Sequence, residues 1–287
     1  TYQPREYCVQ YGESDLQFIH RLLGEEGIHY HFSHTEKNSQ LIISDHPSGW
    51  STGLNAVQYK PGTGQAAADD TLQSLRVRHE VSVNATSHRH FDFHQPLHLT
   101  DVQQQTPAVA GEQPQPGASS AGREHLNHYF YQSDTADTSQ AALRAQRHLE
   151  ARQREVVTAQ GRGNLPQLHS GWLLPVIGHN REEFNTNWLL TSLTVSGEQP
   201  QVLEEFSGGQ SSLNCQFSAI PWDTLWRPDF VQAKPRLCGV QTATVTGPAG
   251  EEIYTDAFGR VKVQFHWDRE GKEDEKTSCW KIGRAHV

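Results

Sequence analysis

The sequence predicts a mainly β protein with a few helices. Short runs that alternate apolar and polar residues recur along the chain, as in strands buried on one face. Only two segments carry the apolar spacing of amphipathic helices. Turn-forming residues precede the clearest strand, at Gly247–Gly250 and, directly beside it, at Asp256–Gly259. Many short strands with two helices favour a fold dominated by β-sheet.

The first elements lie near the N-terminus. Residues Arg5–Tyr11 alternate and predict a strand. Ser14, followed three residues later by Gln17, forms a capping-box pattern that begins a short helix. Gly27 suits the end of that helix. We expect its buried side to carry Leu16, Phe18, Ile19, Leu22 and Leu23.

A second alternating run, Ile28–His34, predicts a strand with one apolar face. We expect Ile28, Tyr30 and Phe32 to point inward and His29, His31 and Ser33 to point outward. Further strands are predicted at Gln40–Ser44 and Leu72–Val83. Residues 61–70 and 101–122 read as loops, because they are rich in small and polar residues and poor in apolar ones.

The second helix is predicted from Thr138, its cap, to about Glu155. Its expected buried side carries Ala142, Ala145, Leu149 and Val156. Its outer side carries Arg144, Arg147, Arg152 and Arg154, which we interpret as a solvated face with Glu150 and Glu155 as partners. Strands are then predicted at Gly171–Ile177, Trp188–Val195 and Cys215–Ile220, before a packed connector at Pro221–Pro235.

The last predicted strand, Arg260–Trp267, alternates without a break. Val261, Val263, Phe265 and Trp267 fall on one face, which we expect to be half-buried. The charged run Glu270–Lys276 that follows is interpreted as a solvated hairpin loop, and the alternative is an inter-subunit contact.

Composition restricts the functional classes. The 287 residues allow one large or two ordinary domains, and the formal net charge of −9 disfavours a nucleic-acid-binding surface. No apolar run approaches the length of a membrane-spanning helix, and no signal peptide opens the chain. The four cysteines show no C-x-x-C spacing, so we expect buried free thiols: Cys8, Cys215, Cys238 and Cys279.

Two motifs could carry chemistry, and neither is persuasive. Gly49–Gly53 matches G-x-S-x-G around Ser51, but no strand directly precedes it and no helix follows, so a loop is favoured. The histidines of two H-x-H pairs could hold a metal, yet no third ligand is apparent. We interpret both pairs as solvated strand faces or trimer contacts: His29 with His31, and His88 with His90. The sequence therefore predicts no catalytic residue, cofactor or metal site.

Two long motifs resemble VgrG proteins, the spike proteins of bacterial type VI secretion systems, which are related to the hub and spike of contractile phage tails. The resemblance spans roughly residues 1–280. The residues that carry it, expected to be structural, are Tyr7, Cys8, Gln10, Tyr11, Glu26, Gly27, Phe258, Gly259, Arg260, Val261, Phe265, His266, Trp267, Asp268, Cys279 and Trp280.

The resemblance implies a tail-hub-like β-barrel region over residues 1–235, followed by the truncated start of an OB-fold at 236–280. It implies a non-enzymatic homotrimer that sits on Hcp tube proteins and carries a tip protein and effectors through further C-terminal parts. Such a protein is assembled in the bacterial cytoplasm and then injected into target cells. The alternatives are a tail hub of a contractile phage and an effector-bearing hydrolase whose catalytic domain lies beyond this chain.

The chain contains no methionine, and we therefore expect it to be a fragment of a longer protein. The heptapeptide Lys281–Val287 departs from the family pattern, and we hypothesise that it is not native sequence. A fragment that lacks partner strands has unpaired edges, so we expect it to fold poorly alone.

Overall fold

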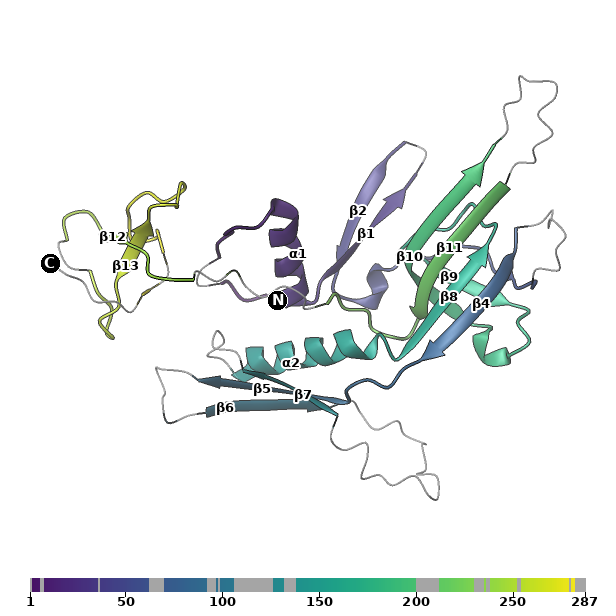
Figure 1. The fold of residues 1–287 in the computed structure, drawn as a ribbon, viewed down its shortest axis with the longest axis horizontal. Helices are drawn as coiled ribbons and strands as arrows, with labels where there is room; N and C mark the ends of the chain where they lie inside the picture. Colours follow the sequence, from purple (N-terminus) through teal and green to yellow (C-terminus); the bar gives the residue numbers. More distant parts are fainter. Residues whose placement is uncertain are drawn as a thin grey trace, which may run out of the picture. The chain divides into compact units, whose positions relative to one another are not determined.

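The computed structural model describes residues 2–5, 8–35, 37–61, 70–91, 97, 99–105, 126–131, 138–199, 212–229, 235, 238–251, 254–278 and 280–281. The chain divides into two compact units. One comprises Thr1–Ile19 with Ala233–Val287, and the other comprises His20–Gln232. In the described part most regular structure is β-strand (Figure 1), which confirms the predicted mainly β class.

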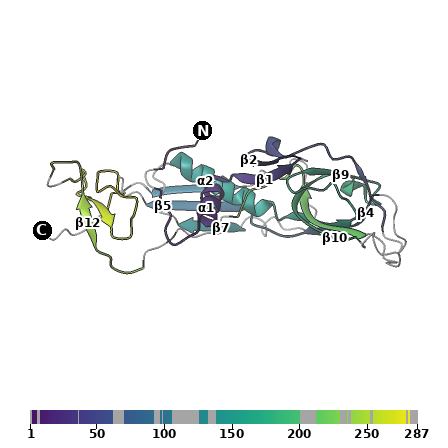
Figure 2. The same ribbon diagram turned by 90° about the horizontal axis from the view of Figure 1, so that it is seen from above.

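The larger unit is built around a curled six-stranded sheet (Figures 1 and 2). In sheet order its strands are β3 (Val57–Gln58), β9 (Leu173–Ile177), β10 (Asn187–Glu198), β11 (Ser212–Pro221), β8 (Val157–Gly163) and β4 (Leu72–His79). The residues after β3 join the two edges. The Tyr59 N–H donates to the Ile177 carbonyl at 2.8 Å, and the Lys60 N–H donates to the Leu72 carbonyl at 2.9 Å. These bonds close the sheet into a small barrel, which confirms the predicted β-barrel region.

Alternating side chains of these strands fill the barrel. The buried core consists of Leu72, Leu75, Ala159, Leu165, Leu168, Leu174, Val176, Trp188, Leu190, Cys215, Phe217 and Ala219. Gly161 lies opposite Phe217 in the β8–β11 pair. A Cβ on Gly161 would lie 2.1 Å from the Phe217 ring, so this position has no room for a side chain. The Phe217 ring therefore packs directly on the backbone of β8.

A second sheet, β6–β5–β7, packs against helix α2 (Thr138–Gln153) (Figure 1). Its strands are β5 (Ala85–Phe91), β6 (Leu99–Gln105) and β7 (Asn127–Tyr131). The prediction of a loop at 101–122 was wrong for its first five residues, because these form most of β6. These polar residues lack a clear apolar alternation, and pairing with β5 decides their conformation. Residues 106–122 lie outside the described residues, as do 62–69 of the other predicted loop.

Helix α1 (Asp15–Glu26) begins and ends as predicted. The Gln17 side chain accepts from the Ser14 N–H at 2.9 Å, and Gly27 adopts the left-handed φ of 67° that ends many helices. The predicted buried side was wrong at Leu16, which is 59% exposed, and at Ile19, which is 49% exposed, whereas Phe18, Leu22 and Leu23 are half-buried. The residues that α1 buries are Arg21 and Glu25, which form an ion pair with each other.

A two-stranded sheet of β1 (His29–His34) and β2 (Ser39–Ser44) follows, and the 3₁₀ turn η1 (Pro47–Gly49) comes next. The predicted facing of β1 was wrong. His29 and His31 are buried, whereas Tyr30 and Phe32 are exposed and lie opposite Ile43 and Leu41 of β2. The alternation was real, but the described structure covers the histidine face with tryptophan rings and leaves the aromatic face open.

The second unit contains one described antiparallel pair, β12 (Ala243–Thr246) with β13 (Lys262–Phe265). The predicted strand Arg260–Trp267 is thus shorter than expected. Its residues Lys262–Phe265 are all half-buried, without the predicted alternation of a buried and an exposed face. Arg5 and Cys8–Tyr11 form no strand, contrary to prediction, and Glu6 and Tyr7 lie outside the described residues. A 3₁₀ turn, η3 (Glu182–Phe184), precedes β10 in the larger unit.

The other predicted strands are confirmed with shifted ends. Gln40–Ser44 corresponds to β2, Leu72–Val83 to β4, Gly171–Ile177 to β9, Trp188–Val195 to β10 and Cys215–Ile220 to β11. The cysteine expectation held at Cys215, which is buried, and was wrong at Cys8 and Cys238, which are exposed. Cys279 lies outside the described residues.

Candidate functional site

The two sequence motifs meet within the smaller unit. Tyr11 packs against Trp267 with ring centroids 4.7 Å apart. The Trp267 indole N–H donates to the Gln241 side chain at 3.0 Å, and the Phe265 ring stacks 5.2 Å from the Trp267 ring. Tyr11 and Trp267 are about 250 positions apart in the sequence, so the motif residues act together as a packing cluster. This contact is aromatic packing, as expected of residues with a structural role.

The Asp256–Arg260 motif forms a tight turn before β13. The Asp256 carboxylate accepts the backbone N–H groups of Phe258 at 3.0 Å and Arg260 at 2.8 Å, and it also pairs with the Arg260 guanidinium. Desolvation alone would raise the pKa of Asp256, but the hydrogen bonds from Arg260 and Phe258 outweigh it and hold the pKa below its ordinary value. Gly259 supplies the positive φ of 70° that the turn requires. Phe258 is left 53% exposed at the tip.

The remaining motif residues support the same region. The Val261 N–H donates to the Lys281 carbonyl at 2.9 Å, and the His266 ring lies 3.1 Å from the Thr242 hydroxyl. Asp268 accepts from the Gly271 N–H at 3.0 Å, which places the predicted loop Glu270–Lys276 in a defined turn. Two other motif residues make side-chain contacts: Trp280 packs against Tyr254, and Gln10 donates a hydrogen bond to Asp15. Cys8 is exposed, and Tyr7 and Cys279 lie outside the described residues.

Helix α2 is tied to the end of α1 by arginines, within the larger unit. Arg147 pairs with Glu26 at 2.9 Å, and Arg227 pairs with Glu150 at 2.7 Å. Arg227 also donates to the Gly27 carbonyl at 2.8 Å. The predicted solvated arginine face of α2 is therefore wrong at Arg147, because tertiary contacts bring a carboxylate from another helix to it. Hydrogen bonds fix these side chains in one geometry, which rigidifies the junction.

The same segment supplies Asp229, which pairs with Arg154 of the α2 end at 2.6 Å. The Arg154 guanidinium lies over the Trp226 ring, 5.2 Å from its centroid. The predicted packed connector Pro221–Pro235 is confirmed over its described part, because Trp226, Arg227 and Asp229 all make tertiary contacts. The prediction that Arg154 lies on a solvated face is therefore also wrong, because Asp229 and Trp226 cover its side chain.

His29 is the most unusual side chain of the larger unit. It is 2% exposed, and neither of its ring nitrogens has a hydrogen-bond partner among the described residues. Its ring stacks on Trp50 at 3.8 Å and meets the edge of Trp226 at 6.0 Å. Burial, with smaller contributions from His31 and Arg227, lowers the pKa of His29 to about 4. His29 is therefore neutral at physiological pH.

His31 is buried beside it. Its Nε2 lies 3.2 Å from the Ser51 hydroxyl, and its Nδ1 has no partner among the described residues. Ser51 belongs to the G-x-S-x-G match, which the structure places in a loop after η1, bridged to Trp172. This confirms the predicted loop. A nucleophile elbow needs a strand before the serine and a helix after it, and a catalytic histidine needs a group that orients its other nitrogen. Both requirements are unmet in the described structure.

The second H-x-H pair is buried as well, which corrects the predicted solvated face. His88 of β5 lies 3.0 Å from His148 of α2, between Nε2 and Nδ1. Burial, together with nearby positive groups, lowers the pKa of His88 to about 4 and that of His148 to about 3. The pair shares one N–H between two neutral rings and fastens α2 to β5.

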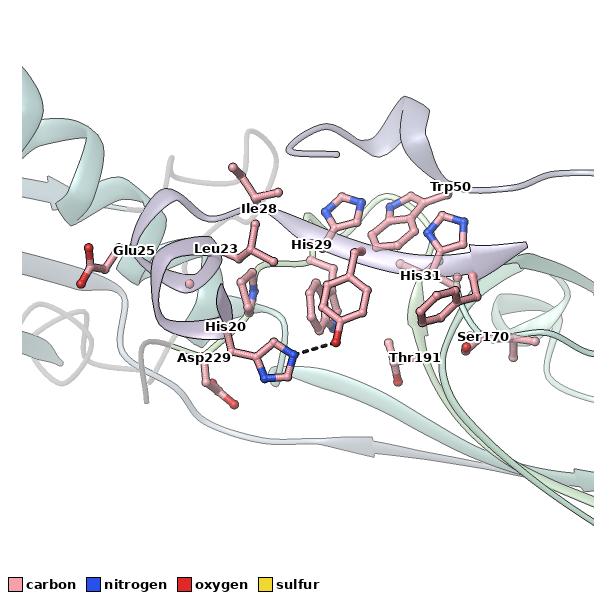
Figure 3. Close-up of a pocket in the computed structure, with 18 of the residues that line it drawn as sticks. His20, Leu23, Glu25, Ile28, His29, His31, Trp50, Ser170, Thr191 and Asp229 are labelled. Atoms are coloured by element: carbon pink, nitrogen blue, oxygen red, sulfur yellow. Dashed lines mark hydrogen bonds between the residues drawn. The ribbon is translucent and has the colours of Figure 1, made fainter. Parts of the chain in front are cut away.

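A cavity of about 480 Å³ opens between α1, β1 and β10 (Figure 3). His29, His31 and Trp50 lie on one side of β1, and the His20 ring and the Tyr30 hydroxyl approach each other on the other side, 2.6 Å apart. Leu189, Leu190 and Thr191 of β10 form the opposite wall. The walls are mostly apolar and aromatic, with a few buried polar atoms, as in many binding pockets.

Among the described residues no group of three potential metal ligands converges. No helix of the described part is long and apolar enough to cross a membrane. His29 and His31 pack against Trp50, and His88 pairs with His148, which accounts for the burial of these histidines.

Comparison with known proteins decides the family. Residues 1–201 match the family model of the phage tail baseplate hub (GPD). The chain belongs to this hub family. The type VI secretion system spike protein VgrG4b of Pseudomonas aeruginosa is 38% identical over 97% of this chain, and the match covers 34% of that protein. The actin cross-linking toxin VgrG1 of Vibrio cholerae is 33% identical over 96% of this chain and 24% of that protein. These matches confirm the resemblance to VgrG proteins.

The fold agrees with this assignment. A solved Escherichia coli component of the type VI secretion system, c3393, which is described as similar to the phage T4 tail proteins gp27 and gp5, matches with a TM-score of 0.55. It is 20% identical, and the match covers 94% of this chain and 54% of that one. The chain spans about a third of the length of VgrG4b and less of the toxin, so the hub family is established for this part alone.

Several residues that shape the larger unit carry no clear signal in the sequence. Trp50, Trp226, Arg227 and Asp229 are scattered over nearly 180 positions and belong to no short motif. The only available signal was the pair of tryptophans in the proline-rich connector, which indicated packing but not a partner.

Proposed function

We propose that this chain is the hub part of a structural spike protein of a type VI secretion apparatus. The observation that carries the proposal is the 38% identity to a type VI spike protein over 97% of the chain. The match of residues 1–201 to the phage tail baseplate hub family supports it. The proposed work is mechanical: the hub forms the rigid base of a spike that contraction drives into a target cell.

The structure is suited to a mechanical part. The barrel closes on itself through residues 57–60, which leaves no exposed edge where those bonds form. Arginine–carboxylate pairs at Arg147, Arg154 and Arg227 fasten α2 to its neighbours. The candidate serine and histidines lack the constellation of a hydrolase, which supports a non-enzymatic role for this part.

The partners and location are part of the proposal. We propose a homotrimer that sits on the Hcp tube, carries a tip protein and effectors through parts beyond this chain, and is assembled in the cytoplasm before injection. We further propose that residues 1–235 form the hub region and that 236–280 begin an OB-fold module. The described β12–β13 pair is compatible with the first strands of such a module.

The test is deletion of the full-length gene in its own bacterium, followed by complementation. We expect Hcp release into the medium and killing of neighbouring cells to stop, and both to return with the full-length gene. Native mass spectrometry of the full-length protein is expected to give three times the subunit mass. Normal Hcp release in the deletion strain, or a monomeric mass, would contradict the proposal.

A phage tail hub is the second candidate, favoured by the family match of residues 1–201. It predicts that the deletion leaves Hcp release intact and instead yields tailless particles after prophage induction. An effector-bearing hydrolase is the third candidate. Its catalytic domain would lie beyond this chain, so it predicts hydrolytic activity of the full-length protein. Activity of this chain alone that is lost on Ser51→Ala would instead indicate an enzyme within this chain, which the spike proposal does not predict.

A further inference from the structure

The polypeptide crosses between the two compact units twice. The first crossing, from Ile19 to His20, falls inside helix α1. The second crossing, from Gln232 to Ala233, falls in the connector that follows strand β11. Any force that the smaller unit exerts on the larger unit along the chain therefore enters through α1 or through the connector. Within the larger unit, the end of α1 and the described part of the connector are held at one place.

The end of α1 is held by arginines from other segments. The helix itself has no basic residue in its last turn. Arg147 of α2 donates to the Glu25 carbonyl at 3.4 Å and pairs with the Glu26 carboxylate at 2.9 Å. Arg227 of the connector donates to the Gly27 carbonyl at 2.8 Å. These two guanidinium groups supply the donors and the positive charge that the carbonyl end of a helix favours.

Gly27 leaves room for the stems of both arginines. A Cβ on Gly27 would lie 3.2 Å from Cγ of Arg147 and 3.2 Å from Cδ of Arg227, so it would push the stems apart. The positive φ of 67° at Gly27 also disfavours other residues. Glu26 and Gly27 belong to the motif residues that resemble VgrG proteins. Their place here explains both: Glu26 pairs with Arg147, and Gly27 fits between two arginine side chains.

The connector is held by the end of α2. Arg154, the residue that follows α2, pairs with Asp229 at 2.6 Å and donates to the Arg227 carbonyl. Its guanidinium also lies 5.2 Å from the centroid of the Trp226 ring. Arg227 pairs in turn with Glu150 of α2 at 2.7 Å, and only 13% and 18% of these two side chains are exposed. Because this pair is mostly buried, salt screens it less than it screens a surface pair.

The three segments form a closed cycle of contacts. Helix α2 contacts the end of α1 through Arg147 and contacts the connector through Glu150 and Arg154. The connector contacts the end of α1 through Arg227, which also donates to the Asp45 carbonyl at 2.6 Å. Arg227 therefore takes part in two of the three sides of the cycle. Its removal is expected to loosen the end of α1 and the connector together.

The arginine clamp comprises the residues that join these three segments: Glu25–Gly27, Arg147, Glu150, Arg154, Trp226, Arg227 and Asp229. We propose that the arginine clamp anchors both chain connections of the smaller unit and transmits force from them to the larger unit. Gly27 and Arg227 are 200 positions apart in the sequence, yet the two connections meet at one largely buried site. Force transmission rests on the proposed spike function, whereas the joint anchoring of the two connections does not.

Hydrogen exchange of the full chain tests the joint anchoring. Arg227→Met keeps the apolar stem and removes the guanidinium. We expect amide exchange to rise at least about tenfold in two peptides, one covering Ile28 at the end of α1 and one covering Trp222 of the connector, whose N–H groups are hydrogen-bonded. Strands β8 and β11 are expected to keep their rates. The matched control, Arg162→Met, removes an exposed arginine–asparagine hydrogen bond of the barrel and is expected to change neither peptide.

A second variant covers a failure to fold. If circular dichroism shows that Arg227→Met is unfolded, Arg227→Lys replaces it, because lysine keeps the charge but lacks the fork of donors that bonds Glu150 and the Gly27 carbonyl at once. Faster exchange in only one of the two peptides, in neither of them, or equally in the barrel strands would overturn the joint anchoring.

Force transmission is tested with the full-length protein in its own bacterium. In the deletion strain complemented by the full-length gene, Arg227→Met is expected to give the normal subunit mass and oligomer, but killing of neighbouring cells is expected to fall to that of the deletion strain. Arg162→Met is expected to kill normally. Equal killing by the two variants would overturn force transmission and leave the spike function intact. If the wild-type gene does not restore Hcp release, the spike function itself fails, and hydrogen exchange still decides the joint anchoring.

Discussion

The two H-x-H strands of this protein share a sequence pattern and differ in how their histidines are satisfied. In β5, His88 shares a hydrogen bond with His148 across a helix–sheet contact, 3.0 Å between nitrogens. In β1, His29 is equally buried, but its ring stacks on Trp50 and neither of its nitrogens has a hydrogen-bond partner among the described residues. The first pair therefore joins two elements of the fold, whereas the second leaves hydrogen-bonding capacity unused. The difference teaches that the same sequence pattern can bury its histidines in two ways, by a hydrogen bond to a second element or by aromatic packing.

The largest loss of stability is expected from a substitution at Gly171, whose backbone packs against the His31 ring. A Cβ on Gly171 would lie 2.4 Å from the His31 ring, and Gly171 has a φ of 78°. Gly171→Ala is expected to lower the free energy of unfolding by about 2–5 kcal/mol, from left-handed strain and overpacking together. Gly53→Ala is the matched control, because Gly53 also has a positive φ but a Cβ there has only an ordinary contact with Trp172 at 3.9 Å. Urea denaturation measures both, and equal losses would show that the β1 histidines are loosely packed.

Two single variants test the comparison: one removes His148, the partner of His88 in β5, and the other removes His29 of β1. His148→Leu leaves His88 buried without its partner, and we expect a loss of roughly 1–3 kcal/mol. His29→Phe removes no hydrogen bond and is expected to change stability by less than about 1 kcal/mol. The double variant H88L/H148L is expected to recover part of the loss of the single one. If His29→Phe lowered the free energy of unfolding more than His148→Leu, the histidine of β1, and not the pair at β5, would be the one that stabilises the fold.

Acid is expected to destabilise the protein through both strands. The slope of the free energy of unfolding against pH is expected to grow with the number of buried histidines that take up a proton on unfolding. The pKa of His29 and of His88 is about 4 and that of His148 about 3, below the ordinary value of 6.5. The unfolded chain therefore binds more protons than the folded chain between pH 6.5 and about 4, so stability is fully present above pH 6.5 and falls as pH drops through this window. Each histidine contributes up to about 1.4 kcal/mol per pH unit.

Melting temperatures measured from pH 7.5 to 4.5 test this dependence. H88L/H148L is expected to flatten the curve more than His29→Phe, because it removes two histidines with a lowered pKa and His29→Phe removes one. A curve that none of these variants changes would show that other groups control the acid response.

The smallest effect is expected on the outer face of β5. Arg89 and Asp101 of β6 form an ion pair that is nearly half exposed on both sides. Asp101→Asn is expected to cost about 0.2–1 kcal/mol, because water screens such pairs. Its effect should shrink further in 1 M salt, whereas that of His148→Leu should not. A salt-independent loss above 1 kcal/mol would show that this surface is less hydrated than its exposure indicates.

Local sequence patterns predicted what depends on neighbouring residues. Ser14 and Gln17 marked the start of α1, Gly27 marked its end, and alternation located β4, β9, β10 and β11. Cap and turn preferences act within a few residues, so the sequence alone determines them. Strand β6 was missed because its pairing with β5, and not its own alternation, makes it a strand.

The facing of strands and the satisfaction of polar groups depended on distant residues. Alternation in β1 distinguished two faces, but the rings of Trp50 and Trp226 decided that the histidine face is the buried one. Likewise, Arg147 and Arg154 looked solvated until Glu26 and Asp229 were placed beside them. The sequence by itself determined the mainly β class, the helix caps and the motifs of the hub family. Only the tertiary structure decided which face each strand buries and where a cavity remains, because burial depends on what the rest of the chain packs against a face.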